Sequence, residues 1–241
     1  ANYWSVGDTK TITLSGTVGT LALNSSYKVF IIGFNHNSDK EGTGISFSGF
    51  RSLDATNKEL CLVDQYYNSY NSTTTSFTMN PGTSSTSTNV GGWKKAKIRK
   101  NILGSTDVEN GDATSATITS PGANTLMAAL PADLRAVLKP ITKYTDCVGN
   151  KSTAASAILP TVDYLPLMAE FEVFGTRSYA NENEKTYQAQ YQYYKNGNSK
   201  IKYKHSDVST AASWWLRSPS SGDAATFCYV ISSGSANYRY S

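Results

Sequence analysis

The chain is best understood from Trp214-Trp215-Leu216-Arg217-Ser218-Pro219, a block of bulky side chains near the end of 241 residues. The residues that follow, 220–241, are mostly small or aromatic, with almost no apolar continuity. Tyr, Ser, Gly, Asn and Arg dominate this run, as in evolved binding surfaces. Tyr offers a large contact area with few torsions to fix, and Ser and Asn adapt their hydrogen bonds. The pattern predicts a rigid block that presents a surface.

The same run also fits a simpler structure. Phe227, Cys228 and Val230 could be strand residues of a β-hairpin that face a core, and polar turns would then close the hairpin. Ordinary loops are also rich in Ser and Gly. The residues alone leave both interpretations open.

Composition sets the class of protein. Charged residues make up 17% of the chain and the formal net charge is +4, whereas about 25% charged residues is usual. The cysteines, Cys61, Cys147 and Cys228, lie far apart without a CxxC pair, so neither a zinc site nor a redox pair is indicated. No apolar run approaches the roughly 18 residues of a membrane span. We expect no cofactor, no metal and no membrane span.

The basic residues Lys94, Lys95, Lys97, Arg99 and Lys100 surround Trp93. Their spacing suits one face of a helix, and no aromatic residue that could stack on bases is interleaved with them. We therefore expect a solvated helix face here, and no nucleic-acid partner.

The predicted elements are strands first, then helices, then strands again. Alternating or β-branched apolar residues predict strands at 9–14, 27–32 and 45–47, and a further strand at 76–79 within an irregular excursion over 64–91. Helical spacing predicts one helix over 92–103, a pair over 124–138 that restarts at Pro131, and an exposed helix over 182–195, with a loop over 104–122.

No βαβ repeat is visible, which makes the class α+β. We expect a single domain over 1–241, with a β-rich part at about 1–60, a helical middle at about 92–140 and a C-terminal hairpin at 214–241.

Residues for catalysis are scarce. His36 follows an apolar strand and is expected to be structural, and His205 is expected at the surface or behind a site. Glu170 and Glu172 would share a face on a strand, where two carboxylates could serve glycoside hydrolysis. No nucleophile elbow, HExxH, P-loop, GxGxxG or EF-hand sequence occurs. The sequence predicts no catalytic residue and disfavours an enzyme.

Several motifs carry a resemblance to a known family. The Trp-Trp-Leu-Arg-Ser-Pro block is followed by Phe-Cys-x-Val and Ser-Gly-x-Ala-Asn, and further matches occur at 3–8, 33–37, 129–134 and 170–175. Together they resemble an uncharacterised domain family of Firmicutes, their phages and gut metagenomes. That resemblance implies a C-type lectin-like fold, similar to the variable proteins that retroelements diversify in phages and bacteria.

The resemblance also implies two sets of residues. The scaffold would comprise Trp214, Trp215, Arg217, Ser218 and Pro219, with Phe227, Val230 and Gly234. The ligand-binding surface would comprise Ser220, Ser221, Asp223, Ala224, Ala225, Tyr229, Ile231, Ser232, Ser235, Asn237, Tyr238, Arg239 and Tyr240. Arg217 is expected to fix the backbone through carbonyl groups or through a carboxylate such as Asp207.

The expected function is non-enzymatic binding of a protein or glycan ligand on a cell surface, by a domain displayed on a phage virion or bacterial cell surface. The alternatives are a structural virion or pilus subunit and a glycoside hydrolase. A homo-oligomer is compatible with the resemblance. The calcium-dependent sugar motifs of animal lectins are absent, and we expect the chain to be a fragment of a longer protein because family members continue into a closing strand.

Overall fold

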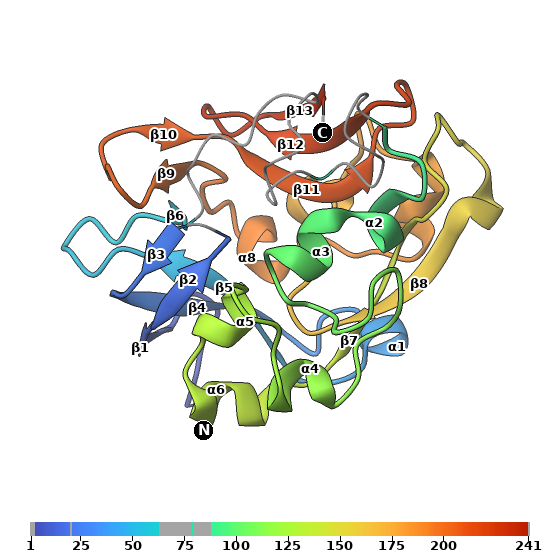
Figure 1. Ribbon diagram of the computed structural model, residues 1–241. Coiled ribbons are helices and arrows are strands. Elements are labelled where there is room, and N and C mark those ends of the chain that lie inside the picture. Colours follow the sequence, from blue (N-terminus) through green and yellow to red (C-terminus); the bar gives the residue numbers. More distant parts are fainter. Residues whose placement is uncertain (1–2, 20, 63–78, 80–87, 241) are drawn as a thin grey trace.

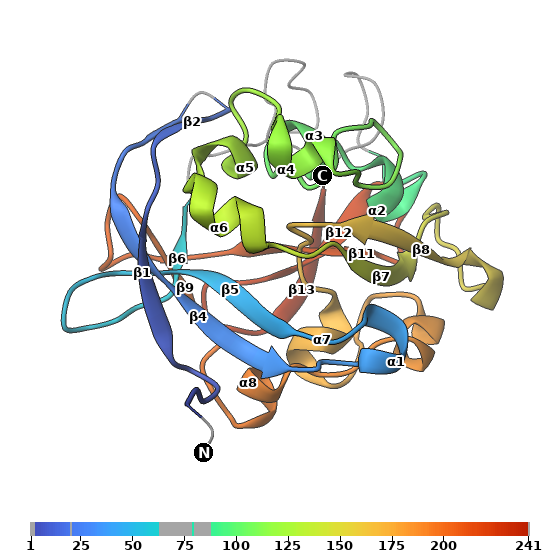
Figure 2. The same cartoon turned by 90° about the horizontal axis from the view of Figure 1, so that it is seen from below.

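The computed structural model describes residues 3–19, 21–62, 79 and 88–240. An antiparallel sheet of order β1-β4-β5 forms the N-terminal part, and a β2–β3 hairpin extends from it (Figure 2). The bounds of these strands are β1 Thr9–Thr13, β2 Gly16–Val18, β3 Leu21–Leu23, β4 Ser26–Phe34 and β5 Ile45–Arg51. The three strands predicted before residue 50 are confirmed. The strand predicted at 76–79 lies outside the described residues except for Met79, which is buried.

The C-terminal residues form a second antiparallel sheet of order β11-β12-β13 (Figure 1). Its strands are β11 Trp214–Pro219, β12 Thr226–Val230 and β13 Ala236–Tyr240. A small sheet of β10 (Ala211–Ala212), β9 (Lys202–Lys204) and β6 (Leu60–Cys61) lies beside it.

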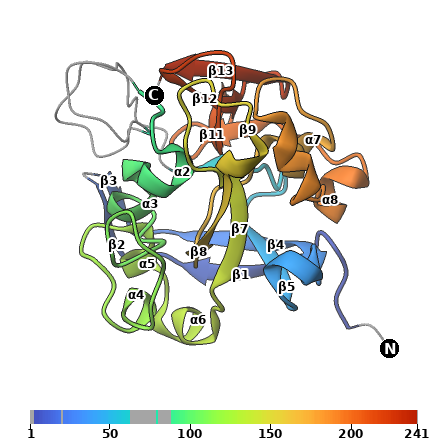
Figure 3. The same cartoon turned by 90° about the vertical axis from the view of Figure 1, so that its right-hand side faces the viewer.

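Sequence patterns missed the ribbon of β7 (Ile141–Asp146) and β8 (Ile158–Asp163). One face of this ribbon buries Lys143, Thr145, Thr161 and Asp163. Because these inward side chains are polar, the usual apolar alternation of a half-buried strand is absent. Figure 3 shows β7 running between the C-terminal sheet and the N-terminal strands.

The helices are short. The α-helices are α1 Ser38–Glu41, α2 Gly92–Lys95, α3 Lys97–Asn101, α4 Ala116–Thr119, α5 Leu126–Ala129, α6 Ala132–Val137, α7 Glu170–Phe174 and α8 Gln192–Lys195, and two 3-10 turns are η1 Ala155–Ala157 and η2 Glu182–Thr186. The predicted helix pair around Pro131 is confirmed as α5 and α6. The region 104–122, predicted as a loop, contains α4.

The single helix predicted over 92–103 is wrong, because Ala96 is extended and separates α2 from α3. The break has a physical reason. The indole N–H of Trp93 and the Nε of Arg99 both bind the carboxylate of Asp163, at 3.2 and 2.6 Å. Residues six apart do not share a side of a continuous helix. Arg99 is thus fully buried, and its predicted place on a solvated face is also wrong.

The exposed helix predicted over 182–195 is also wrong. The segment forms η2 and α8, and Tyr191, Tyr193 and Tyr194 are buried in a core cluster. The Gln188 amide donates to the Tyr144 carbonyl and the Glu184 carboxylate. Several of the Tyr and Gln side chains of this segment therefore point into the protein, and a high content of these residues did not mean that the segment is exposed.

Two apolar clusters make the core, and β12 contributes to both. Phe227 belongs to one cluster with Trp215, whereas Cys228 and Val230 belong to the other with Leu216. Neighbouring residues on a strand face opposite ways, so this strand has apolar neighbours on each face. The architecture is α+β, as predicted. No helix in the described ranges combines the length and apolar character needed to cross a membrane.

Candidate functional site

The two tryptophans of β11 hold the C-terminal sheet from different sides. Trp215 is 8% exposed in the cluster that contains Phe227, whereas Trp214 is partly buried against the other cluster. The Trp214 indole donates to the Lys200 carbonyl at 2.9 Å. The two side chains therefore do not form one layer beneath a surface, because adjacent strand residues point in opposite directions.

Arg217 fixes β11 to three other segments. Its guanidinium forms a bidentate pair with Glu172, at 2.5 and 2.8 Å. It also donates to the Thr145 hydroxyl at 2.6 Å and to the Leu167 carbonyl at 2.7 Å. The partner types were predicted, but Asp207 was wrong as the carboxylate. Asp207 instead accepts hydrogen bonds from two residues of its own turn.

Lys143 extends this pair into a buried ion network. Its Nζ lies 2.6 Å from Glu41 Oε2 and 2.9 Å from Glu172 Oε1, and it donates to the Tyr191 hydroxyl at 2.8 Å. Burial alone would raise the pKa of Glu172, but Arg217 and Lys143 hold it well below its usual range. The pKa of Glu41 is raised, by burial first. The network joins α1, β7, α7 and β11.

His36 lies at the edge of the network. Its ring stacks on Tyr191 with 3.7 Å between centroids, and its Nε2 lies 3.8 Å from Glu41 Oε1. Burial lowers the pKa of His36 to about 4, opposed by the negative charge of Glu172 and aided by the positive charges of Lys143 and Arg217. The ring is therefore neutral at physiological pH, in keeping with the structural role expected for it.

These groups also offer one cluster of potential metal ligands. Atoms of His36, Glu41 and Glu172 lie within 4.8 Å of one another. The ammonium of Lys143, however, already bonds to both carboxylates. The charge that a metal ion would supply is provided there by a lysine.

Glu170 and Glu172 lie on helix α7, so the prediction that they share a face of a strand is wrong. The Glu170 carboxylate accepts hydrogen bonds from the backbone N–H groups of Ser178, Tyr179 and Ala180. Glu172 is held by Arg217 and Lys143, and neither glutamate is accessible to solvent. Both carboxylates have partners and are shielded from a substrate.

Glu184 connects η2 to β7 and β11. It accepts hydrogen bonds from the Asp146 backbone N–H at 3.0 Å, the Ser218 hydroxyl at 2.7 Å and the Gln188 amide at 3.0 Å. Burial raises the pKa of Glu184 to about 7, against the lowering effect of these bonds. The carboxyl group thus titrates near neutral pH.

The predicted ligand-binding residues differ in exposure. Ser232, Ser235, Tyr238 and Arg239 are exposed. The partly buried members are Ser221, Asp223, Ala224, Ala225, Tyr229, Ile231 and Asn237. Ser220 is 2% exposed and cannot belong to a surface, because its backbone bridges to Ala180 and pairs with Thr226. The side chain of Tyr240 lies outside the described ones.

The tyrosines of this region make different contacts. Tyr229 packs on Trp215, with ring centroids 5.9 Å apart. Tyr238 is 44% exposed and packs on Tyr179, with centroids 5.0 Å apart. Tyr179 comes from the loop after α7, which no sequence pattern marked as part of the site. Its carbonyl accepts hydrogen bonds from the backbone and hydroxyl of Ser221.

The scaffold residues are more uniformly placed. Ser218, Pro219, Phe227 and Val230 are all buried, and Gly234 is partly buried. His205, expected at the surface or behind a site, is partly buried.

Together these contacts define an α+β domain in which a buried ion network fixes the strand that leads into an exposed C-terminal surface. The chain belongs to the family described as Domain of unknown function (DUF6273), which matches residues 57–241. That description names neither a lectin nor a retroelement-diversified protein. No match was found among curated proteins or among solved structures.

Proposed function

We propose that this chain is a non-enzymatic binding domain with a C-type lectin-like scaffold, displayed on a phage virion or bacterial cell surface. Its C-terminal surface, defined as Ser232, Ser235, Asn237, Tyr238 and Arg239, would contact a protein or glycan ligand on a cell. The observation that carries this proposal is a contrast in burial between two strands of the C-terminal sheet, β11 and β13. Arg217 is fully buried and bidentately paired, whereas Tyr238 and Arg239 on β13 are exposed.

The composition of this surface supports the proposal. Tyr and Arg are enriched among residues that dominate binding energy, and Ser and Asn supply adaptable hydrogen bonds. A few side chains fall well short of the roughly 20 to 30 per partner in a standard interface. Single-site affinity is therefore expected to be modest, and display in several copies would supply avidity.

The two alternatives are less well supported. Glycoside hydrolysis needs two accessible carboxylates, and Glu170 and Glu172 are both buried and occupied by hydrogen bonds. A structural virion or pilus subunit would bury the C-terminal surface against another copy. Small-angle scattering of the concentrated chain tests that alternative, because a structural subunit requires the chain to associate with itself. Our proposal is compatible with a monomer.

The test is capture of whole cells. The chain is biotinylated, assembled on fluorescent streptavidin and incubated with a panel of gut Firmicutes, and binding is counted by flow cytometry. The buffer holds about 0.3 M salt, which screens general attraction between exposed lysines and anionic cell walls. We expect at least one panel member to be labelled, and the variant Tyr238→Ala/Arg239→Ala to lose that labelling without losing its melting transition. The control Lys139→Ala/Lys195→Ala changes two exposed residues elsewhere. Labelling that survives in the first variant contradicts the proposal.

A further inference from the structure

A basic surface on α2 and α3 lies outside the C-terminal surface. Its cations are Lys94, Lys95, Lys97 and Lys100, of which Lys95 is exposed and the others are partly buried. Within the described ranges, no carboxylate forms an ion pair with any of these four ammonium groups. None of these four positive charges is therefore held in a close ion pair by a described carboxylate.

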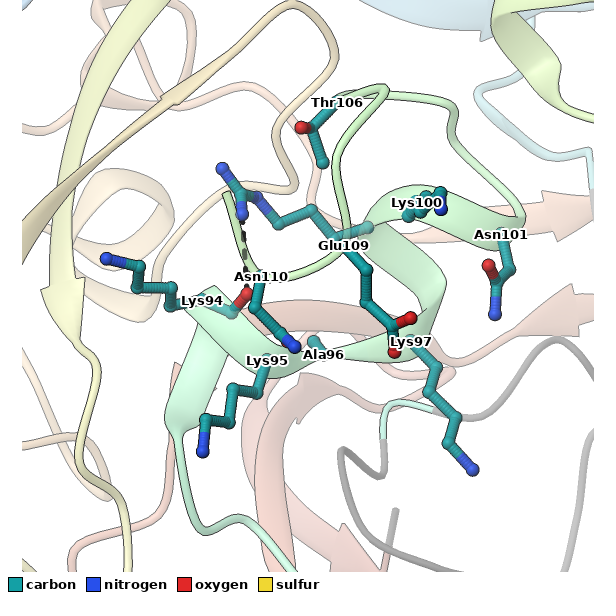
Figure 4. A pocket seen from close by; sticks show the side chains of 10 residues that line it. Lys94, Lys95, Ala96, Lys97, Lys100, Asn101, Thr106, Glu109 and Asn110 are labelled. Atoms are coloured by element: carbon teal, nitrogen blue, oxygen red, sulfur yellow. Dashed lines mark hydrogen bonds between the residues drawn. The ribbon is translucent and has the colours of Figure 1, made fainter. Parts of the chain in front are cut away.

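The direction of the side chains indicates the kind of anion that fits. Figure 4 shows the four lysine side chains leaving the helices in different directions, with the carboxylate of Glu109 among them. A single compact anion needs cations that converge on one point, and these do not. A polymer that carries one negative charge per repeat can be met by cations spread along a surface.

A polar depression adjoins these lysines. It has a volume of about 380 Å³, and it is lined by Lys100 of the basic surface together with Asn101 and Thr106. Its other polar side chains are Asp107, Ser120, Asn124 and Thr125, and none of its lining residues is aromatic. The hydroxyl groups of Thr106 and Thr125 are already bonded to nearby backbone groups. Asn101, Ser120 and Asn124 therefore supply the amide and hydroxyl groups that can donate to and accept from the hydroxyl groups of a polyol.

We propose that this surface binds a base-free phosphodiester polymer, a chain of polyol phosphates. The lysines would meet successive phosphates, and the amide and hydroxyl groups beside them would meet the polyol. Single-stranded nucleic acid fits less well because its binding sites add aromatic rings on which bases stack. Trp93, the one aromatic residue within the basic sequence, is fully buried in the core.

The probe for this proposal is deacylated lipoteichoic acid with a poly(glycerol phosphate) backbone. Its binding to the full chain is measured by biolayer interferometry at salt concentrations from about 0.05 to 0.3 M, and the affinity is expected to fall steeply as salt rises. The variant Lys95→Glu/Lys97→Glu is expected to bind about tenfold more weakly or worse. Lys95→Arg/Lys97→Arg keeps both charges and is expected to bind as the parent chain does.

The control Lys139→Glu/Lys195→Glu makes the same change in net charge at exposed positions on other parts of the chain. An equal loss of binding in this control, or no binding by the parent chain, would overturn the proposal. Equal affinity for oligo(dT) would overturn the preference for a base-free polymer. The variant Tyr238→Ala/Arg239→Ala is expected to bind the polymer normally, which separates this proposal from the proposed cell-binding function. Melting curves establish that each variant is folded.

Discussion

Arg217 and Glu172 join the C-terminal sheet to helix α7. Two parallel hydrogen bonds join them without access to solvent, and Lys143 also donates to Oε1, one of the two carboxylate oxygens that Arg217 contacts. Such a pair is weak evidence of net stabilisation, because both charges lost their hydration on folding. Removing one partner has a large effect, since the other charge then stays buried without compensation.

Replacement of Arg217 by Met is therefore expected to lower the free energy of unfolding by about 3 to 5 kcal/mol. Urea denaturation measures this change. Arg239→Met is the matched control, because Arg239 is exposed on β13, and a surface substitution is expected to stay within about 0.5 kcal/mol. Equal effects of the two substitutions would contradict the network that we describe.

Glu184 gives the domain a distinct pH dependence. Its pKa rises from the model-peptide value of 4.5 to about 7 on folding, so the folded chain binds a proton that the unfolded chain has released. The resulting stability is fully present below pH 4.5 and is lost as the pH rises through about 7. Glu184→Gln does not titrate, so the stability of the parent chain relative to this variant should fall by about 3 kcal/mol between pH 4 and pH 8. Thermal melts of both chains across that range check this prediction. A difference in stability that stays constant with pH would contradict the raised pKa of Glu184.

At the scale of elements, a positive φ and a close backbone contact at Gly92 set where helix α2 begins. Gly92 has a φ of +51°, and a Cβ on it would lie 2.0 Å from the Asp146 carbonyl oxygen at the end of β7. Only glycine fits both conditions, since other residues rarely adopt this φ and any Cβ would collide with backbone. The α2–β7 contact thereby places Trp93 and the following lysines.

Gly92→Ala is expected to destabilise the domain by more than about 2 kcal/mol, because it combines strain at positive φ with a backbone clash. Gly222→Ala is the control, since its nearest contact would be the Ser220 hydroxyl at 3.8 Å. Chemical denaturation measures the free energy of unfolding of both variants. A tolerated alanine at position 92 would mean that α2 and β7 are not packed as described.

The sequence predicted those elements whose pattern is set by apolar burial. Strands β1 and β4 and the helices on either side of Pro131 show this, because their inward residues are apolar. The ribbon β7–β8 and the partly buried segment 182–195 could not be predicted in this way, since Lys143, Asp163 and Glu184 are among their inward residues. The partners that make such burial tolerable come from remote segments, and the spacing of residues in sequence does not show them.

The same limit applied to the candidate site. The Trp-Leu-Arg-Ser-Pro block lies buried in β11. Its sequence did not show that Arg217 pairs with Glu172, which lies 45 positions away along the chain. Ser220 was expected at the surface because the family resemblance implied it, but Ser220 pairs with Ala180 and is buried. Tyr179 was missed because only the packed structure brings it against Tyr238.

For the whole molecule, the ion network joins the two ends of the chain. The family match begins at residue 57, yet Glu41 from the N-terminal part binds Lys143, and Phe30 and Ile32 share a core cluster with Leu216 and Val230. The N-terminal sheet is thus part of the same packed body as the C-terminal sheet.

A fragment of residues 57–241 is accordingly expected not to fold on its own. It would leave Lys143 without one carboxylate and would open both apolar clusters. Circular dichroism melts and the dispersion of amide proton NMR signals report the outcome for the fragment beside the full chain. A cooperative melt of the fragment would show that the N-terminal sheet is dispensable.

We propose that a buried framework carries the fold and leaves the C-terminal surface free to meet a partner. A display library randomised at Ser232, Ser235, Asn237, Tyr238 and Arg239 tests this claim most directly, beside a second library randomised at Leu216, Arg217, Ser218, Phe227 and Cys228. The measurement is the fraction of clones that resist protease. We predict that most clones of the first library resist and almost none of the second do, and similar losses in both libraries would contradict the account.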